Sequence, residues 1–193
     1  MTGHPPPAAT GAPDARDPDL DDVLAAKADR AAFGLLYRRY LERVYGYCYY
    51  LLGDHHDAQD VTERTFVAAL AAIDGFRDEG ASFRAWLFRI AHNQLANALR
   101  TRGRQRVARL DAIPEPRGSA DPLNDLTRDE DARRVRHALG LLAEDRRQVL
   151  VLRFVDGLST VEIGQVLGRS DGAVRVLQHR ALRDLADRLD GTD

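Results

Sequence analysis

Apolar residues recur at spacings of three and four along most of the chain from Leu20 onward, which is the period of an amphipathic α-helix. Strand-like alternation of apolar and polar residues is absent. The pattern therefore predicts an all-α fold. In the first half of the chain it predicts four helices, at about 20–30, 31–52, 57–73 and 83–102, with a break over 53–56 and a loop over 74–80.

The helical period is lost over residues 111–128. Pro114, Pro116 and Pro122 lie there within nine residues, and proline lacks the backbone N–H that a helix needs. We predict a flexible linker over 106–128 between two small helical domains, 19–105 and 129–190. Residues 1–18 hold five prolines and are expected to form a disordered tail.

The end of the chain has the pattern of two helices joined by a tight turn. Ser159 and Glu162 have the spacing of a capping box, and the short helix that they begin ends at Gly168. Ser170 can cap a longer helix over about 171–189. A short helix, a glycine turn and a second helix predict a helix-turn-helix. The inward positions of the second helix are Val174, Leu177, Ala181 and Leu185.

Another face of this second helix carries polar and basic residues suited to the major groove of DNA. Arg175, His179 and Arg183 follow one another at intervals of four residues and form one stripe along the helix. A helix with such a stripe can enter the major groove, where arginine binds the edges of guanine bases. Arg169, Ser170 and Arg180 are expected near phosphates. The alternative is the solvated face of an ordinary helical hairpin. The candidate set is Arg169, Ser170, Gly172, Arg175, Val176, His179, Arg180 and Arg183.

A second basic segment covers residues 80–110, which contain seven arginines and no Asp or Glu. Arginines neutralise phosphates, and exposed aromatic rings stack on unpaired bases. Asn93 and Asn97 share a helix face and can bind base edges. These groups suit single-stranded or melted nucleic acid. The alternative is that Phe83 and Trp86 are core residues and that the two amides only face solvent.

Acidic residues gather at the start of the third predicted helix. The helix dipole is a sufficient reason for Asp57, whereas Asp60 and Glu63 suggest a protein partner. His55, His56 and Asp57 are adjacent on a loop and have no distant ligand beside them, so we predict no metal site.

The composition narrows the function classes. A single cysteine, Cys48, excludes an intrachain disulfide framework. The longest apolar run has eight residues, fewer than the roughly 18–20 of a membrane span, and no signal peptide is visible, so we expect a cytoplasmic protein with no membrane contact. The sequence shows no nucleophile–base pair, no phosphate-binding glycine loop and no metal cluster. We therefore expect neither an enzyme nor a bound cofactor. The net charge of −2 by itself argues against a nucleic-acid binder, because such proteins are usually basic. The sum, however, results from the acidic first helices and linker cancelling the charge of the basic segments.

Three segments, taken in order, carry a family resemblance. They are DAQDVTERTF at 57–66, FRAWLFRIAHN at 83–93 and GLSTVEIGQVLGRSDGAVRVLQHRAL at 157–182. With a linker and a terminal helix-turn-helix, the chain resembles the sigma factors of bacterial RNA polymerase over about 20–189. The similarity is to the small extracytoplasmic-function (ECF) group of the sigma-70 family.

The resemblance implies a transcription-initiation factor that binds core RNA polymerase through its β′ clamp and β flap. Such a factor recognises the −10 and −35 promoter elements and promotes DNA melting, and it has an anti-sigma factor as a further partner. The polymerase contacts it implies are Asp57, Asp60, Glu63 and Arg64. The −10 contacts are Phe76, Arg77, Ser82, Arg84, Asn93, Asn97 and Arg100, and the helix over 171–185 would contact the −35 element. The alternative is a stand-alone helix-turn-helix regulator that binds duplex DNA without polymerase.

Overall fold

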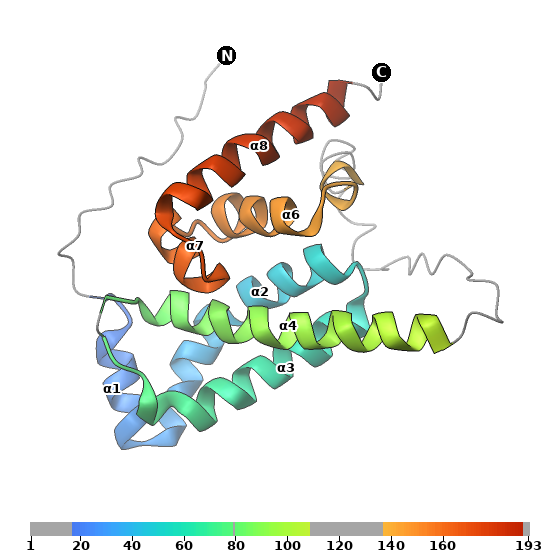
Figure 1. Ribbon diagram of the computed structural model, residues 1–193. Helices are drawn as coiled ribbons and strands as arrows, with labels where there is room; N and C mark the ends of the chain where they lie inside the picture. The colour runs from blue at the N-terminus through green and yellow to red at the C-terminus, as the bar shows by residue number, and fades with distance from the viewer. Residues whose placement is uncertain (1–16, 79, 109–136, 191–193) are drawn as a thin grey trace, which may run out of the picture.

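A computed structural model of the chain describes residues 17–78, 80–108 and 137–190, and all regular structure in these residues is helical (Figure 1). The predicted all-α fold is confirmed. The longer helices are α1 (Leu20–Ala28), α2 (Phe33–Leu52), α3 (His55–Ala72), α4 (Phe83–Ala108), α6 (Glu144–Leu150), α7 (Thr160–Leu167) and α8 (Asp171–Asp190). Shorter segments are η1 (Arg30–Ala32), η2 (Ile73–Gly75) and the π-helical η4 (Val151–Val155).

Most of the predicted tail and linker lies outside the described residues. Of the tail over 1–18, only Asp17 and Pro18 are described. Of the linker over 106–128, only 106–108 are described, and these residues continue α4 beyond its predicted end near Arg102. The tail, the linker and the domain boundaries stay predictions.

Helix α3 begins two residues earlier than the sequence pattern predicted. The backbone N–H of Asp57 donates to Asp54 Oδ1 at 3.0 Å, so Asp54 is the N-cap and His55 the first helical residue. Gly53, with φ 66°, ends α2 in the left-handed conformation that glycine adopts easily. The break between α2 and α3 is therefore only two residues long.

The N-terminal helices share an aliphatic and aromatic core. The ring of Phe83 at the start of α4 is fully buried, and its centroid lies 5.8 Å from that of Tyr40 on α2. The Asp17 carboxylate accepts from the Phe83 N–H, and Asp19 accepts from the Tyr40 hydroxyl. These bonds tie the residues before α1 to α2 and α4. Large side chains buried with them are Leu36, Val44, Tyr47, Phe66, Ile73, Leu87, Phe88 and Leu95.

The predicted helix-turn-helix is confirmed as α7 and α8. Ser159 Oγ accepts from the Glu162 N–H at 3.2 Å, and Glu162 Oε2 accepts from the Ser159 N–H at 2.8 Å, which completes the capping box. Gly168, with φ 65°, ends α7, and Ser170 Oγ accepts from the Ala173 N–H at 3.3 Å. The predicted inward residues Val174, Leu177 and Ala181 are buried.

The two helical units pack against each other. Figure 1 shows α7 lying between α8 and α4. The buried core is continuous across this contact, because Leu152, Leu158 and Ile163 of the second unit belong to the same apolar cluster as Phe83 and Leu87. No helix among 17–78, 80–108 and 137–190 is both long and apolar enough to cross a bilayer.

Candidate nucleic-acid interface

The outward face of the helix-turn-helix is formed as the sequence pattern predicted. Because Val174 and Leu177 point into the core, the residues between them point outward. All eight candidate residues are exposed: Arg169, Ser170, Gly172, Arg175, Val176, His179, Arg180 and Arg183. Arg175 Nη2 lies 2.9 Å from Asp171 Oδ2 on the same helix. Contact of these side chains with DNA stays a prediction.

The side chain of Asp171, the first residue of α8, interacts with residues of both α7 and α8. Hydrogen bonds from the Thr160 hydroxyl and from Arg175 hold the pKa of the Asp171 carboxyl below its ordinary value. Thr160 is the first residue of α7, so this carboxylate joins the first turns of both helices.

A second exposed stripe runs along α4. Asn93, Asn97 and Arg100 are all exposed and lie three or four residues apart, with Arg89 one turn before them. Arg100 donates to Asn97 Oδ1, so the amide and the guanidinium form one polar cluster. Leu95 lies on the opposite, buried face. The structure thus brings three of the predicted −10 residues together on one surface.

Ser82 and Arg84 are separated from that stripe and are bound to the second helical unit. Ser82 Oγ donates to Glu162 Oε1 at 2.7 Å, and Arg84 Nη2 donates to Glu162 Oε2 at 2.6 Å. Burial acts to raise the pKa of Glu162, but the bonds from Arg84 and Ser82 outweigh it and the pKa lies below its ordinary value. Glu162 is therefore ionised at neutral pH and holds both side chains.

Phe76, which belongs to the predicted −10 set, lies in the core of the first helical unit. Its ring is only 2% exposed and packs edge-on against Phe83 and Trp86, with centroids 5.9 and 5.5 Å apart. Lys27 Nζ donates to the Phe76 carbonyl at 2.7 Å. Phe76 thus anchors the loop before α4 in the core, and its ring is covered in this arrangement. Arg77 next to it is exposed and donates to the Asp74 carbonyl at 2.7 Å.

The candidate polymerase residues divide into two groups on α3. Asp60, Glu63 and Arg64 are exposed on one face, and Arg64 Nη2 lies 3.3 Å from Asp60 Oδ2. Asp57 instead pairs with Arg102, so it connects α3 to α4. Val67 is 63% exposed and extends the outer face by one turn. Val67 lies inside an apolar run of the sequence, which hides its exposure, although its spacing from Asp60 and Glu63 places it on the same helix face.

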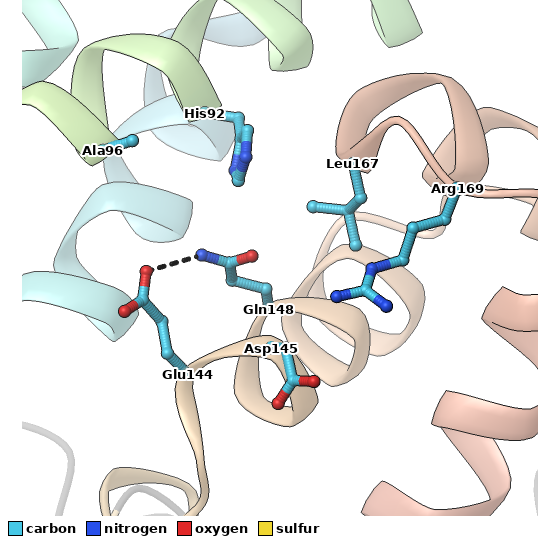
Figure 2. Close-up of a pocket in the computed structure, with 7 residues that line it drawn as sticks. All are labelled: His92, Ala96, Glu144, Asp145, Gln148, Leu167 and Arg169. Atoms are coloured by element: carbon cyan, nitrogen blue, oxygen red, sulfur yellow. Dashed lines mark hydrogen bonds between the residues drawn. The ribbon is translucent and has the colours of Figure 1, made fainter.

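A cavity of about 470 Å³ lies between the two helical units (Figure 2). Gln148 Nε2 donates to Glu144 Oε1 at 3.0 Å on one wall, and the guanidinium of Arg169 lies on another. No group of three or more His, Cys, Asp or Glu side chains in the described parts of the chain could hold a metal ion. The complete lining is His92, Ala96, Glu144, Asp145, Gln148, Leu167 and Arg169.

Comparison with known families defines the class of the protein. Residues 36–105 match the model of sigma-70 region 2, and residues 132–185 match that of sigma-70, region 4. A helical region 2 followed by a helix-turn-helix region 4 defines a sigma-70 type factor. The chain belongs to the ECF group of RNA polymerase sigma factors, which confirms the resemblance seen in the sequence.

Two curated relatives and one solved structure illustrate this membership. The chain is 35% identical to ECF RNA polymerase sigma factor BldN of Streptomyces coelicolor over 86% of its own length and 63% of that protein's. It therefore spans less than two thirds of BldN. It is 40% identical to ECF RNA polymerase sigma factor ShbA of Streptomyces griseus, over 70% of this chain and 73% of ShbA.

The fold is similar to that of the sigma factor RpoE from Bartonella quintana, solved in complex with the anti-sigma factor NepR. The TM-score is 0.65 at 26% sequence identity, over 83% of this chain and 98% of RpoE.

Proposed function

We propose that this chain is an ECF sigma factor that directs transcription initiation. It binds core RNA polymerase, recognises the −10 and −35 promoter elements and promotes DNA melting. The observation that carries the proposal is the capped helix-turn-helix of region 4, whose eight candidate residues are exposed while its apolar residues are buried. The stripe of Asn93, Asn97 and Arg100 supplies a second surface, suited to the −10 element.

The exposed faces support the proposed partners within the polymerase. The α3 face with Asp60, Glu63 and Arg64 is proposed to bind the β′ clamp, and region 4 the β flap. An anti-sigma factor is proposed as a further partner, as in the RpoE–NepR complex. Because the polymerase supplies the chemistry, this chain is proposed to act as a specificity factor and not as an enzyme. Its proposed place of action is the cytoplasm.

Run-off transcription with purified core polymerase tests the function. We expect a promoter-dependent product only when the chain is added, together with co-purification of the chain with the core enzyme. Absence of both would refute the proposal. Tight binding to duplex DNA without polymerase would instead favour a stand-alone regulator.

Replacing Arg175 by alanine is expected to weaken binding to the cognate −35 element by about 1–3 kcal/mol. The reason is that Arg175 is the first residue of the exposed α8 stripe, near the N-terminus of the helix, where an arginine reads base edges. The measurement is the affinity of the polymerase complex for promoters with the native and with altered −35 sequences, and the loss should be largest for the native one.

The matched control is Arg180→Ala, because Arg180 is an exposed arginine of the same helix that is assigned to phosphates. Its removal should weaken all sequences by the same factor. If Arg175→Ala also weakened every sequence equally, Arg175 would be a phosphate contact only.

A further inference from the structure

Region 4 covers part of the proposed −10 surface. Glu162 of α7 accepts from Ser82 and from two nitrogens of Arg84, at 2.7, 2.6 and 3.1 Å. Gln165 Nε2 of the same helix donates to the Gly80 carbonyl at 2.5 Å. The Glu162 carboxylate thus accepts hydrogen bonds from the same guanidinium and hydroxyl groups that a DNA phosphate would contact there. While α7 stays in place, neither Ser82 nor Arg84 is free to bind DNA.

A second acidic residue, Asp156, is buried in this contact. Asp156 follows η4 and is only 2% exposed, and neither carboxylate oxygen has a hydrogen-bond partner within the described parts of the chain. Its backbone carbonyl accepts from Arg43 of α2, so the residue is held against the first helical unit. A buried carboxylate without a hydrogen bond is costly when it is charged, and it avoids that cost by binding a proton.

Groups from several helices act on this carboxyl or lie close to it. Arg43 of α2 and Arg84 of α4 favour its charged form. The Tyr47 hydroxyl and the Cys48 thiol of α2 lie close enough to interact with it, and Glu144 of α6 acts on the same Tyr47. His92 of α4 lines the cavity beside Glu144 and lies 3.3 Å from the Tyr47 hydroxyl, measured at Nδ1.

We propose, on the basis of the function proposed above, that this structure is a closed state in which α7 covers the part of the −10 surface formed by Ser82 and Arg84, and that loss of a proton from Asp156 favours opening. In the open state Asp156 is solvated and Arg84 is released from Glu162. The contact between the two regions is then a switch that responds to pH.

The direction of the pH effect follows from the two states of Asp156. Burial raises the pKa of its carboxyl to about 7 in the closed state, against the opposing action of Arg43 and Arg84, while a solvated Asp156 has its ordinary value of 3.8. Between these values the closed state binds more protons than the open state. Opening therefore becomes easier as pH rises through this window, by up to tenfold per pH unit, and levels off above about 7.

His92 acts in the opposite direction. Burial lowers the pKa of its imidazole in the closed state, so through His92 it is acid that favours opening. The sign of the pH response therefore distinguishes Asp156 from His92.

Pulsed electron paramagnetic resonance on the full chain, without polymerase or DNA, tests the switch. Spin labels are placed at Gln59→Cys on α3 and Ala186→Cys on α8, both exposed positions, while the native Cys48 is buried. We expect a single short distance at pH 5 and a growing population of longer distances up to pH 8. An unchanged distance distribution over this range would overturn the proposal.

Three further variants assign the effect. Asp156→Asn mimics the protonated acid and should stay closed as pH rises, whereas Asp187→Asn, at an exposed aspartate of α8, should behave like the parent chain. Glu162→Gln keeps a residue that suits a capping box but loses the charge that holds Arg84, so it should be more open at every pH. If Asp156→Asn opened with pH as the parent does, Asp156 would not be the switch. If Glu162→Gln were no more open than the parent, the masking contact would be refuted.

The same variants separate this proposal from the function on which it rests. With core polymerase, Asp156→Asn should need more protein than the parent chain to reach half-maximal transcription at pH 7.5. Equal requirements would refute the masking role, while a lack of transcript from every variant would refute the function and leave the distance measurement to decide on closure.

Discussion

Replacing Phe83 by alanine is expected to lower the free energy of unfolding by about 3–5 kcal/mol, because the loss of a buried ring adds a cavity to the lost transfer energy. The Phe83 ring is fully buried and contacts the rings of Tyr40, Phe76 and Trp86, with centroids 5.6 to 5.9 Å apart. Denaturant unfolding followed by circular dichroism measures the loss. The residue also begins α4, so weakened packing there is expected to disturb Ser82 and Arg84 next to it.

Phe154→Ala is the matched control, since Phe154 is the same residue type and is 61% exposed. Its removal should change the free energy of unfolding by no more than about 0.5 kcal/mol. A loss below about 1 kcal/mol for Phe83→Ala, or equal losses for the two variants, would show that the ring does not anchor the core.

Replacing Gly164 by alanine is expected to destabilise the helix-turn-helix by about 1–3 kcal/mol through overpacking. A Cβ atom at this position would lie 2.6 Å from the Arg169 carbonyl oxygen, which belongs to the backbone of the turn and has little room to move. The gain of about 1 kcal/mol that alanine brings to a helix works against this loss. Thermal unfolding measures the balance, and the displaced turn should also weaken −35 binding through Arg169 and Ser170.

The control is Gly172→Ala in α8, where an added Cβ meets no atom within 4 Å. There the helix propensity of alanine acts alone, and we expect unchanged or slightly raised stability. If Gly164→Ala were as stable as Gly172→Ala, the close approach of the turn to α7 would not be a constraint.

The sequence pattern predicted the helices well because helical period and capping are local properties. Ser159, Glu162 and Ser170 were identified as capping residues and are capping residues in the structure. Asp54 was interpreted as part of a break although it caps α3, since an Asp in a turn and an Asp at an N-cap look alike in a sequence.

What the pattern did not predict are the contacts between residues distant in the chain. Phe76 lies in a short polar loop, and only the fold shows that its ring joins the core. Asp156 carries no sequence signal for burial, because its surroundings come from α2 and α4 more than 70 residues earlier. Periodicity tells which face of a helix is apolar but not which helix covers it, and so the contact between Glu162 and Arg84 was not foreseen.

Because of the capping box of α7, the two partners of the contact between the regions, Glu162 and Arg84, respond differently when the contact breaks. The Ser159 amide and hydroxyl donate to Glu162 Oε2 at 2.8 and 2.9 Å, and these bonds lie within region 4 itself. When α7 leaves α4, the Glu162 carboxylate keeps these donors, and the first turn of the helix-turn-helix stays in place. Arg84, in contrast, loses the Glu162 carboxylate, and its guanidinium then has a free site for another anion. Separation of the two regions therefore leaves the helix-turn-helix intact, and at the same time it frees Arg84 on the −10 surface to bind a DNA phosphate.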